Sequence, residues 1–313
     1  MKRLFALFLV LVLMVSSTAC GGSYTSHDDE EDDSPRATVS SDPTVSSDPT
    51  ASSDPIAQPD LPPLEFQEQT VVDNEYCTIR ITGIDPDNFW GYTLNVYLEN
   101  KSVDTDYNFF VGFASVNGLT MDPVFYADVS AGKKLNDEIS FTNQELCDLV
   151  GQFTDIELTF QVTDTNDRLA KPVANPTVHV YPYGADKATV YQRPAQDTDT
   201  IVVDNDQVTM IVTEYTVDPI WGYSVKVFLV NKTDQELMFS VKDVSVNDYM
   251  MDPYWADLVE GGKCAYSSLS WLDSDFEDNG ITDVYNIEFT LRAYDATNWS
   301  AEDILNMKVE LNP

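Results

Sequence analysis

Two long stretches of this 313-residue chain are versions of the same sequence. Residues 71–102, VVDNEYCTIRITGIDPDNFWGYTLNVYLENKS, align with residues 202–233, VVDNDQVTMIVTEYTVDPIWGYSVKVFLVNKT. Further on, DIELTFQVTDTND at 155–167 aligns with NIEFTLRAYDATN at 286–298. The matches keep their order over about 110 residues, which is the length of a domain and too long for a solenoid unit. The sequence therefore predicts two copies of one domain.

Each copy has the alternation that is typical of half-buried strands. Cys77, Ile79 and Ile81 alternate with polar residues, and the same period of two recurs along VKVFLV in the second copy. Seven or eight short strands in a domain of this length favour a sandwich of two antiparallel sheets. The predicted fold is all-β, with two tandem immunoglobulin-like antiparallel β-sandwich domains after a disordered stalk.

The composition divides the chain into five segments. We predict a signal peptide over residues 1–19 and a lipidated Cys followed by an acidic stalk over residues 20–66. The first sandwich is expected over residues 67–182 and the second over residues 198–313. A polar linker, residues 183–197, separates them. Each copy also contains one short helix, because Thr142 and Ser274 are each followed three residues later by Glu.

A shorter duplicated stretch raises the question of a reactive site. TMDPVFYADVSAGKK at 120–134 matches MMDPYWADLVEGGK at 250–263. Pro after the SVN strand end limits ladder pairing, and a glycine turn then returns the chain. We interpret this stretch as a strand that crosses from one sheet to the other, with its aromatic pair packed inward.

The start of the chain indicates export. Met1, Lys2 and Arg3 precede an unbroken apolar run over residues 4–15 and the small residues SSTAC, as in a secretory signal. The run is shorter than the roughly 20 residues of a spanning helix, which makes a transmembrane anchor the weaker interpretation.

Cys20 lies where cleavage of the signal would fall and is followed by two glycines. This arrangement resembles the lipobox of bacterial lipoproteins, in which the Cys becomes the lipidated first residue. Thr18 and Ala19 fit that pattern, whereas Ser17 stands where an aliphatic residue is usual. With its stalk and repeats, the chain resembles Gram-positive cell-surface lipoproteins with tandem immunoglobulin-like domains. The alternative is an ordinary secreted protein with an incidental Cys20.

The stalk and the overall charge limit the partners. HDDEEDD and TVSSDPTVSSDPTASSDP have almost nothing apolar to bury, so this stretch is predicted to be disordered. The net charge is −36, and both repeats are acidic as well. Phosphate backbones and anionic headgroups would be repelled, which excludes nucleic acid and leaves a lipid as the means of membrane attachment.

Aromatic residues are the candidate ligand contacts. Trp90 and Trp221 stand in identical WGY settings and are predicted to be core anchors, with a sugar-stacking platform as the alternative. Trp299 has no aromatic counterpart in the first copy and is the better candidate for an exposed contact. The aromatic residues of the crossing strand complete the set of possible contacts: Tyr126, Tyr254 and Trp255.

Catalytic and metal-binding motifs are weak in this sequence. Asp122 with Asp128, and Asp252 with Asp257, could form an acid pair of a glycosidase or part of a calcium site, but Asp is also common in turns. The second copy contains no histidine, so a Ser-His-Asp or Cys-His site cannot be built there. We therefore expect no catalytic activity, no metal and no cofactor.

Three cysteines follow Cys20, namely Cys77, Cys147 and Cys264. A Cys77–Cys147 bridge is one possibility. The second copy has Val208 in place of Cys77, which favours the alternative of a small buried hydrophobic residue. The sequence thus predicts an exported, lipid-anchored protein on the outer face of the membrane. It acts as a binding module for an envelope or extracellular protein or glycan, or as a spacer.

If Cys20 carries the lipid, Cys20→Ala should release the protein from the membrane into the medium. The measurement is a fractionation of cells that express the wild type and the variant. A variant that stays in the membrane fraction would contradict the lipidation hypothesis.

Overall fold

The computed structural model describes residues 64, 66–218, 222–298 and 300–313. This part of the chain is almost entirely β structure with antiparallel pairing, so the predicted all-β sandwich architecture is confirmed. The signal, Cys20 and nearly all of the stalk lie outside the described residues. Among the described residues, no helix has the length and apolar character needed to cross a membrane.

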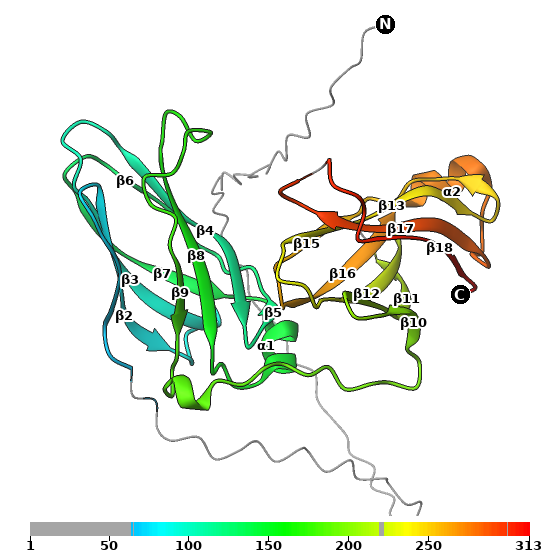
Figure 1. Ribbon diagram of the computed structural model, residues 1–313, viewed down its shortest axis with the longest axis horizontal. Coiled ribbons are helices and arrows are strands. Elements are labelled where there is room, and N and C mark those ends of the chain that lie inside the picture. Colours follow the sequence, from blue (N-terminus) through cyan, green and yellow to red (C-terminus); the bar gives the residue numbers. More distant parts are fainter. Residues whose placement is uncertain (1–63, 65, 219–221, 299) are drawn as a thin grey trace, which may run out of the picture. The chain divides into compact units, whose positions relative to one another are not determined.

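The first sandwich consists of two facing sheets (Figure 1). One sheet follows the order β1 (Gln69–Asp73), β2 (Cys77–Asp85), β3 (Tyr92–Asn100) and β7 (Lys134–Phe141). The facing strands are β5 (Leu119–Thr120), β4 (Tyr107–Val116), β8 (Ile156–Asp164) and β9 (Thr177–Val180), with β6 (Tyr126–Val129) also paired to β4.

The second sandwich repeats this plan. One sheet follows the order β10 (Thr200–Asp204), β11 (Val208–Asp218), β12 (Gly222–Asn231) and β16 (Cys264–Trp271). The facing strands are β14 (Tyr249–Met250), β13 (Leu237–Val246), β17 (Ile287–Asp295) and β18 (Leu305–Leu311), with β15 (Ala256–Val259) also paired to β13. One short helix follows the first sheet in each sandwich. Helix α1 (Gln144–Val150) follows β7, and α2 (Asp273–Asn279) follows β16.

The predicted strand faces are correct. Cys77, Ile79 and Ile81 are fully buried, as are Val225 and Leu229 in the second sandwich. Because alternate residues of a strand point to opposite faces, these rows fill the space between the sheets. Each fully buried aliphatic side chain contributes roughly 1.5–3 kcal/mol relative to exposure.

The duplicated stretch crosses between the sheets, as predicted. Val124 pairs with Ser140 at the free edge of β7, and the chain then continues as β6 on β4 of the facing sheet. Tyr254 pairs with Ser270 in the same way before β15 joins β13. The expectation that both aromatics of each pair point inward was wrong, because successive residues of an extended strand alternate between faces.

The two helices are present, but their caps differ from the predicted ones. The Asn143 side chain caps α1 by accepting from the amide of Leu146 at 3.2 Å, one residue after the expected Thr142. Leu272 is the N-cap of α2, and its amide donates to the Asp275 carboxylate at 3.2 Å. Neighbouring Thr and Asn residues are comparable caps at α1, and α2 begins after a leucine that has no capping side chain, so the sequence locates such a helix only to within a residue or two.

One end of the outer face of the β10–β11–β12–β16 sheet is apolar, which distinguishes the second sandwich from the first. Phe228 and Cys264 are buried on this face and belong to the core cluster of the first sandwich, with Ile211, Val230 and Tyr266 packed against it. The corresponding face of the first sandwich is polar. There the Arg80 guanidinium lies 4.3 Å from the Tyr97 ring centroid, and the Tyr97 hydroxyl donates to Glu99 at 3.0 Å.

The predicted polar linker lies against this apolar face. We call residues 188–199 the connecting segment. The Tyr191 hydroxyl lies 2.9 Å from the Tyr266 hydroxyl, and the Arg193 guanidinium is 5.7 Å from the Phe228 ring centroid. Arg193 also forms two hydrogen bonds with the Asp199 carboxylate, at 2.6 and 2.7 Å. The connecting segment therefore covers the apolar outer-face residues Phe228 and Val230, which stand at positions that the alternation in the second repeat assigns to solvent.

A pair of substitutions tests the importance of this covered face. Phe228→Ser should lower the free energy of unfolding by about 3 kcal/mol or more, because a buried aromatic ring is lost. Tyr97→Ser, at the matching position of the polar face, should lower it by about 1 kcal/mol, the value of a partly exposed hydrogen bond. Urea melts of both variants give these values. Equal losses would mean that the face of the second sandwich is not covered in solution.

Candidate binding surfaces

A groove runs along the outer face of the second sandwich, and we call it the hydroxyl groove. It consists of two adjoining hollows of about 820 and 510 Å³ that share Lys226 and Ser268. Strands β11, β12 and β16 form its floor, and Asn143, the cap of α1, and Glu145 of α1 contribute to its wall. Its hydroxyl-bearing lining residues are Thr198, Thr213, Thr216, Ser224, Ser267, Ser268, Ser270, Tyr215, Tyr254 and Tyr266.

The floor of the hydroxyl groove is a connected set of polar groups. Ser224 and Ser270 are neighbours across the β12–β16 ladder, and their hydroxyls lie 2.8 Å apart. Beside them, the Lys226 ammonium lies 2.8 Å from the Glu214 carboxylate, which raises the pKa of Lys226. Serine and threonine hydroxyls donate and accept, so this floor suits a ligand with many hydroxyl groups of its own.

Two of the predicted contact residues belong to this region. Tyr254 is 57% exposed and lines the smaller hollow beside Ser268 and Ser270. Trp255 is half-buried, and its ring nitrogen donates to the Ser267 hydroxyl at 2.8 Å. Tyr254 can therefore stack on a ligand, whereas Trp255 packs against the core and holds the Ser267 hydroxyl on the inner face of β16.

Asp257 is a carboxylate at an inward-facing position next to the groove. Burial raises its pKa, the Ser267 hydroxyl opposes that shift by hydrogen bonding, and the charge of Asp122 adds to it. Ala127 is the counterpart of Asp257 in the first sandwich, and Asp137 is the counterpart of Ser267. Each sandwich thus has one carboxylate at this place, contributed by opposite strands.

A second surface is the turn between β2 and β3, where Phe89 and Trp90 are 89% and 65% exposed. Their rings meet edge to face with centroids 5.0 Å apart. The Asn88 side chain accepts from the Trp90 amide at 3.0 Å, and its carbonyl accepts from the Gly91 amide at 3.0 Å. Gly91 has φ +113°, and a Cβ there would lie 2.2 Å from the Phe141 carbonyl. The turn is therefore held in one shape that directs both rings outward.

The prediction that Trp90 anchors the core was wrong. Among the described residues, Trp271 is the fully buried tryptophan, and its ring nitrogen donates to the Met251 carbonyl at 3.0 Å. A hydrophobic pair between turn residues, DPDNFWG, was the available signal that Phe89 and Trp90 are exposed. Trp221 and Trp299 lie outside the described residues.

The remaining predicted contact residue is separate from the groove. Tyr126 is exposed on β6, with the Arg168 guanidinium 5.5 Å from its ring centroid. The sequence reasoning did not include the serines of the hydroxyl groove. Their signal is the repetition of Ser at every second position, 268 and 270, on one face of β16.

The acidic pairs do not form a recurring site. Asp122, Asp128 and Asp252 are exposed, whereas Asp257 points inward, so the two pairs are not equivalent. No cluster of three or more metal-ligating side chains occurs within the described ranges. His179 lies with its Nδ1 2.7 Å from the Asp155 carboxylate and its ring stacked on Tyr181.

The three cysteines of the sandwiches are free thiols. Burial raises the pKa of Cys77 to about 11 and that of Cys264 to about 12. Cys77 is therefore the small buried hydrophobic residue of the second alternative, and it is not bridged to Cys147.

The chain matches no known protein family, and no curated protein has a significantly similar sequence. The function therefore has to be argued from the surfaces themselves.

Asp257→Asn should stabilise the protein at neutral pH, by an amount on the order of 1 kcal/mol, because it removes a half-buried charge but can keep the contact with Ser267. Since the folded-state pKa is raised, the folded state holds the proton more tightly than the unfolded state. The wild type should therefore lose stability relative to the variant as the pH rises above about 4. Urea midpoints across this range measure the difference, with Asp252→Asn as the exposed control. A constant difference at every pH would contradict the assignment.

Proposed function

We propose that this chain is a non-catalytic binding module, held at the outer face of the cell membrane by a lipid on Cys20. The partner is an envelope or extracellular protein or glycan. The export signal and the Cys at its end support the anchoring. The acidic charge supports a partner other than nucleic acid.

The observation that carries the binding role is the exposed pair of Phe89 and Trp90. Folding gains nothing from leaving two large rings in water, and a fixed turn holds both of them outward. Rigid aromatic side chains lose little entropy on binding and are enriched among the residues that dominate interfaces. A spacer without a partner gives no reason for this arrangement.

Carbohydrate capture is the second candidate, and the hydroxyl groove favours it. Sugar hydroxyls need donors and acceptors, which Ser224, Ser268 and Ser270 offer, and a sugar ring needs an aromatic face, which Tyr254 offers. The Lys226–Glu214 pair adds charge-assisted donors and acceptors on the same floor.

We further propose that the two sandwiches are tandem copies of one domain. Their strands follow the same order and pairing. Buried asparagines recur at the same place: the Asn100 side chain donates to the Val129 carbonyl at 2.8 Å, and the Asn231 side chain to the Val259 carbonyl at 2.8 Å. Such a shared buried contact supports descent from one sequence, because it depends on two distant strands together.

Binding of the chain to immobilised envelope extract and to a glycan panel tests the proposal. Trp90→Ala should weaken retention at least about tenfold, or about 1.4 kcal/mol, without changing the urea melt. If a glycan is the ligand of the groove, Tyr254→Ala should give the loss, and the ligand should change tryptophan fluorescence. A chain that retains no partner, or variants that bind as the wild type does, would favour the spacer.

A further inference from the structure

One end of the first sandwich forms a joint with the second sandwich. Leu119 of β5 pairs in parallel with Cys264 of β16, and the Gly118 carbonyl accepts from the Cys264 amide at 3.0 Å. Beside this bridge, the Lys263 ammonium forms a short ion pair with the Glu157 carboxylate of β8. One backbone contact, one buried leucine and one ion pair thus define the joint.

Every residue of the joint has a counterpart in the other sandwich. Tyr249 corresponds to Leu119, because Val246 pairs with Tyr249 as Val116 pairs with Leu119. Glu288 corresponds to Glu157, because Glu288 pairs with Ser245 of β13 as Glu157 pairs with Ser115 of β4.

The part of the joint that the second sandwich contributes, Lys263 and Cys264, has counterparts on the first sandwich; we call this part the receiving side. Lys133 corresponds to Lys263, because their carbonyls accept from the amides of Asn100 and Asn231, each at 2.9 Å. The two residues of the Glu157–Lys263 ion pair therefore both have counterparts of the same type. These are Glu288 on the second sandwich and Lys133 on the first. Lys133 and Glu288 are both exposed.

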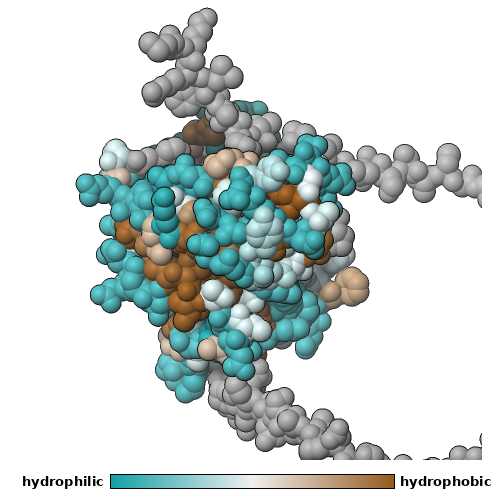
Figure 2. Space-filling model, turned by 90° about the vertical axis from the view of Figure 1, so that its right-hand side faces the viewer, coloured by the Kyte–Doolittle hydropathy of each residue, from teal (hydrophilic) through white to brown (hydrophobic). Residues whose placement is uncertain are grey.

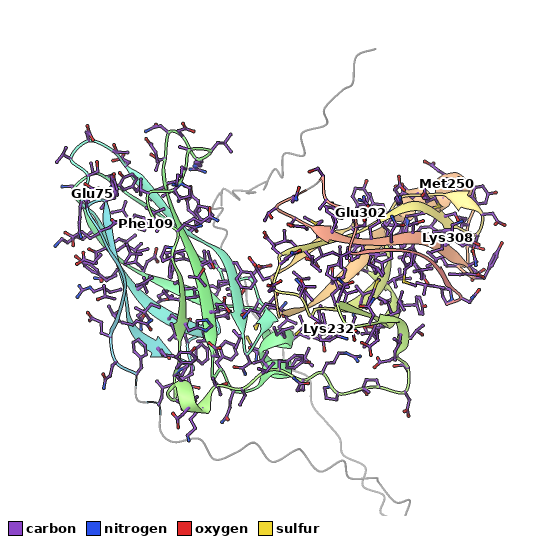
Figure 3. The ribbon with its side chains drawn as sticks, viewed as in Figure 1. Glu75, Phe109, Lys232, Met250, Glu302 and Lys308 are labelled. Carbon is purple, nitrogen blue, oxygen red and sulfur yellow. The ribbon has the colours of Figure 1, made fainter. Side chains whose placement is uncertain are left out.

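The counterpart of the joint on the second sandwich is exposed and apolar, and we call it the distal corner (Tyr249, Met250, Tyr285, Glu288 and Glu310). Met250 is 71% exposed, and Tyr249 and Tyr285 are exposed beside it. Figure 3 labels Met250 at this end, and Figure 2 shows that the face on this side of the molecule carries both hydrophobic and hydrophilic residues. An apolar patch with a polar rim is typical of an interaction site.

The charge of the distal corner is more negative than that of its counterpart. Glu157 pairs across its ladder with His179, whereas Glu288 pairs with Glu310. Asp248 and Asp283 are exposed nearby, in the turns next to Tyr249 and Tyr285. The distal corner therefore presents an apolar centre with an acidic rim, which selects a partner surface of the opposite charge.

The first sandwich carries a matching surface, which we call the basic edge (Arg80, Tyr97, Lys133 and Lys134). Lys133 and Lys134 are exposed, and they lie at the start of β7, the end strand of its sheet. Arg80 and Tyr97 lie on the outer face of the same sheet. Arg80 is paired with Glu68 and Lys134 with Glu99, so Lys133 is the cation of this edge that has no ion pair with another described residue. The basic edge therefore contains Lys133 and Lys134, the counterparts of Lys263 and Cys264 on the receiving side of the joint.

We propose that the distal corner of one copy docks on the basic edge of a second copy, repeating between molecules the joint that exists within each molecule. Tyr249 takes the place of Leu119, Lys134 that of Cys264, and the Glu288 carboxylate pairs with the Lys133 ammonium. Because the two surfaces differ, the contact is heterologous and each added copy leaves one free corner and one free edge. Such a contact produces open head-to-tail chains.

Charge exchange tests this arrangement directly. Lys133→Glu alone would place a carboxylate opposite Glu288, and Glu288→Lys alone would place an ammonium group opposite Lys133, so that the proposed ion pair becomes a like-charge contact. Each variant should therefore be monomeric in sedimentation at physiological salt, where the net charge is screened beyond about 8 Å. An equimolar mixture of the two variants, and the double variant by itself, should assemble as the wild type does, with a mean mass that rises past a dimer as the concentration increases.

Matched controls exclude effects of net charge and of folding. Glu302→Lys and Lys171→Glu make the same charge changes at exposed positions outside both surfaces and should leave assembly unchanged. Met250→Asp should abolish it without changing the urea melt. A wild type that is monomeric at every concentration would overturn the proposal. So would a mixture of the two charge variants that fails to assemble, or a closed dimer that Met250→Asp disrupts and the charge variants do not.

Discussion

An apolar sheet face that cannot be left in water organises the second half of this molecule. Ile211, Phe228 and Val230 point away from their own sandwich core, so a lone second sandwich would expose them. The connecting segment and the end of the first sandwich cover this face. The hydroxyl groove then begins where the apolar rows give way to serine and threonine. The same sheet thus has a covered end and an open end.

The faces of the strands could be predicted from the sequence, and the neighbours of those faces could not. Cys77, Ile79 and Ile81 alternate with polar residues, and this alternation alone specifies which side is buried. Phe228 is apolar at a position that alternation assigns to solvent. Phe228 is buried there because it contacts residues far away in the chain, and a local sequence period carries no information about such contacts.

The candidate surfaces show the same division. Tyr254 was predicted as a possible contact together with the other aromatic residues of the crossing strand, and it is exposed beside the groove. Trp90 was assigned to the core because large aromatics usually lie there, and the constraint of Gly91 on the turn outweighed that tendency. The serines of the groove carry little information individually. Their meaning depends on three strands lying side by side.

The carboxylate that changes strands between the sandwiches has a consequence for their evolution. Asp257 faces Ser267 in the second sandwich, and Asp137 stands at the position facing Ala127 in the first. Moving the crossing strand of the second sandwich into the first would put two carboxylates at one half-buried place, where they cannot both ionise without a penalty. The reverse exchange would leave that place without a carboxylate. Under the proposed duplication, the two strands of each sandwich have diverged together, and an exchange of sequence between the copies keeps one carboxylate at this place only when both strands move together.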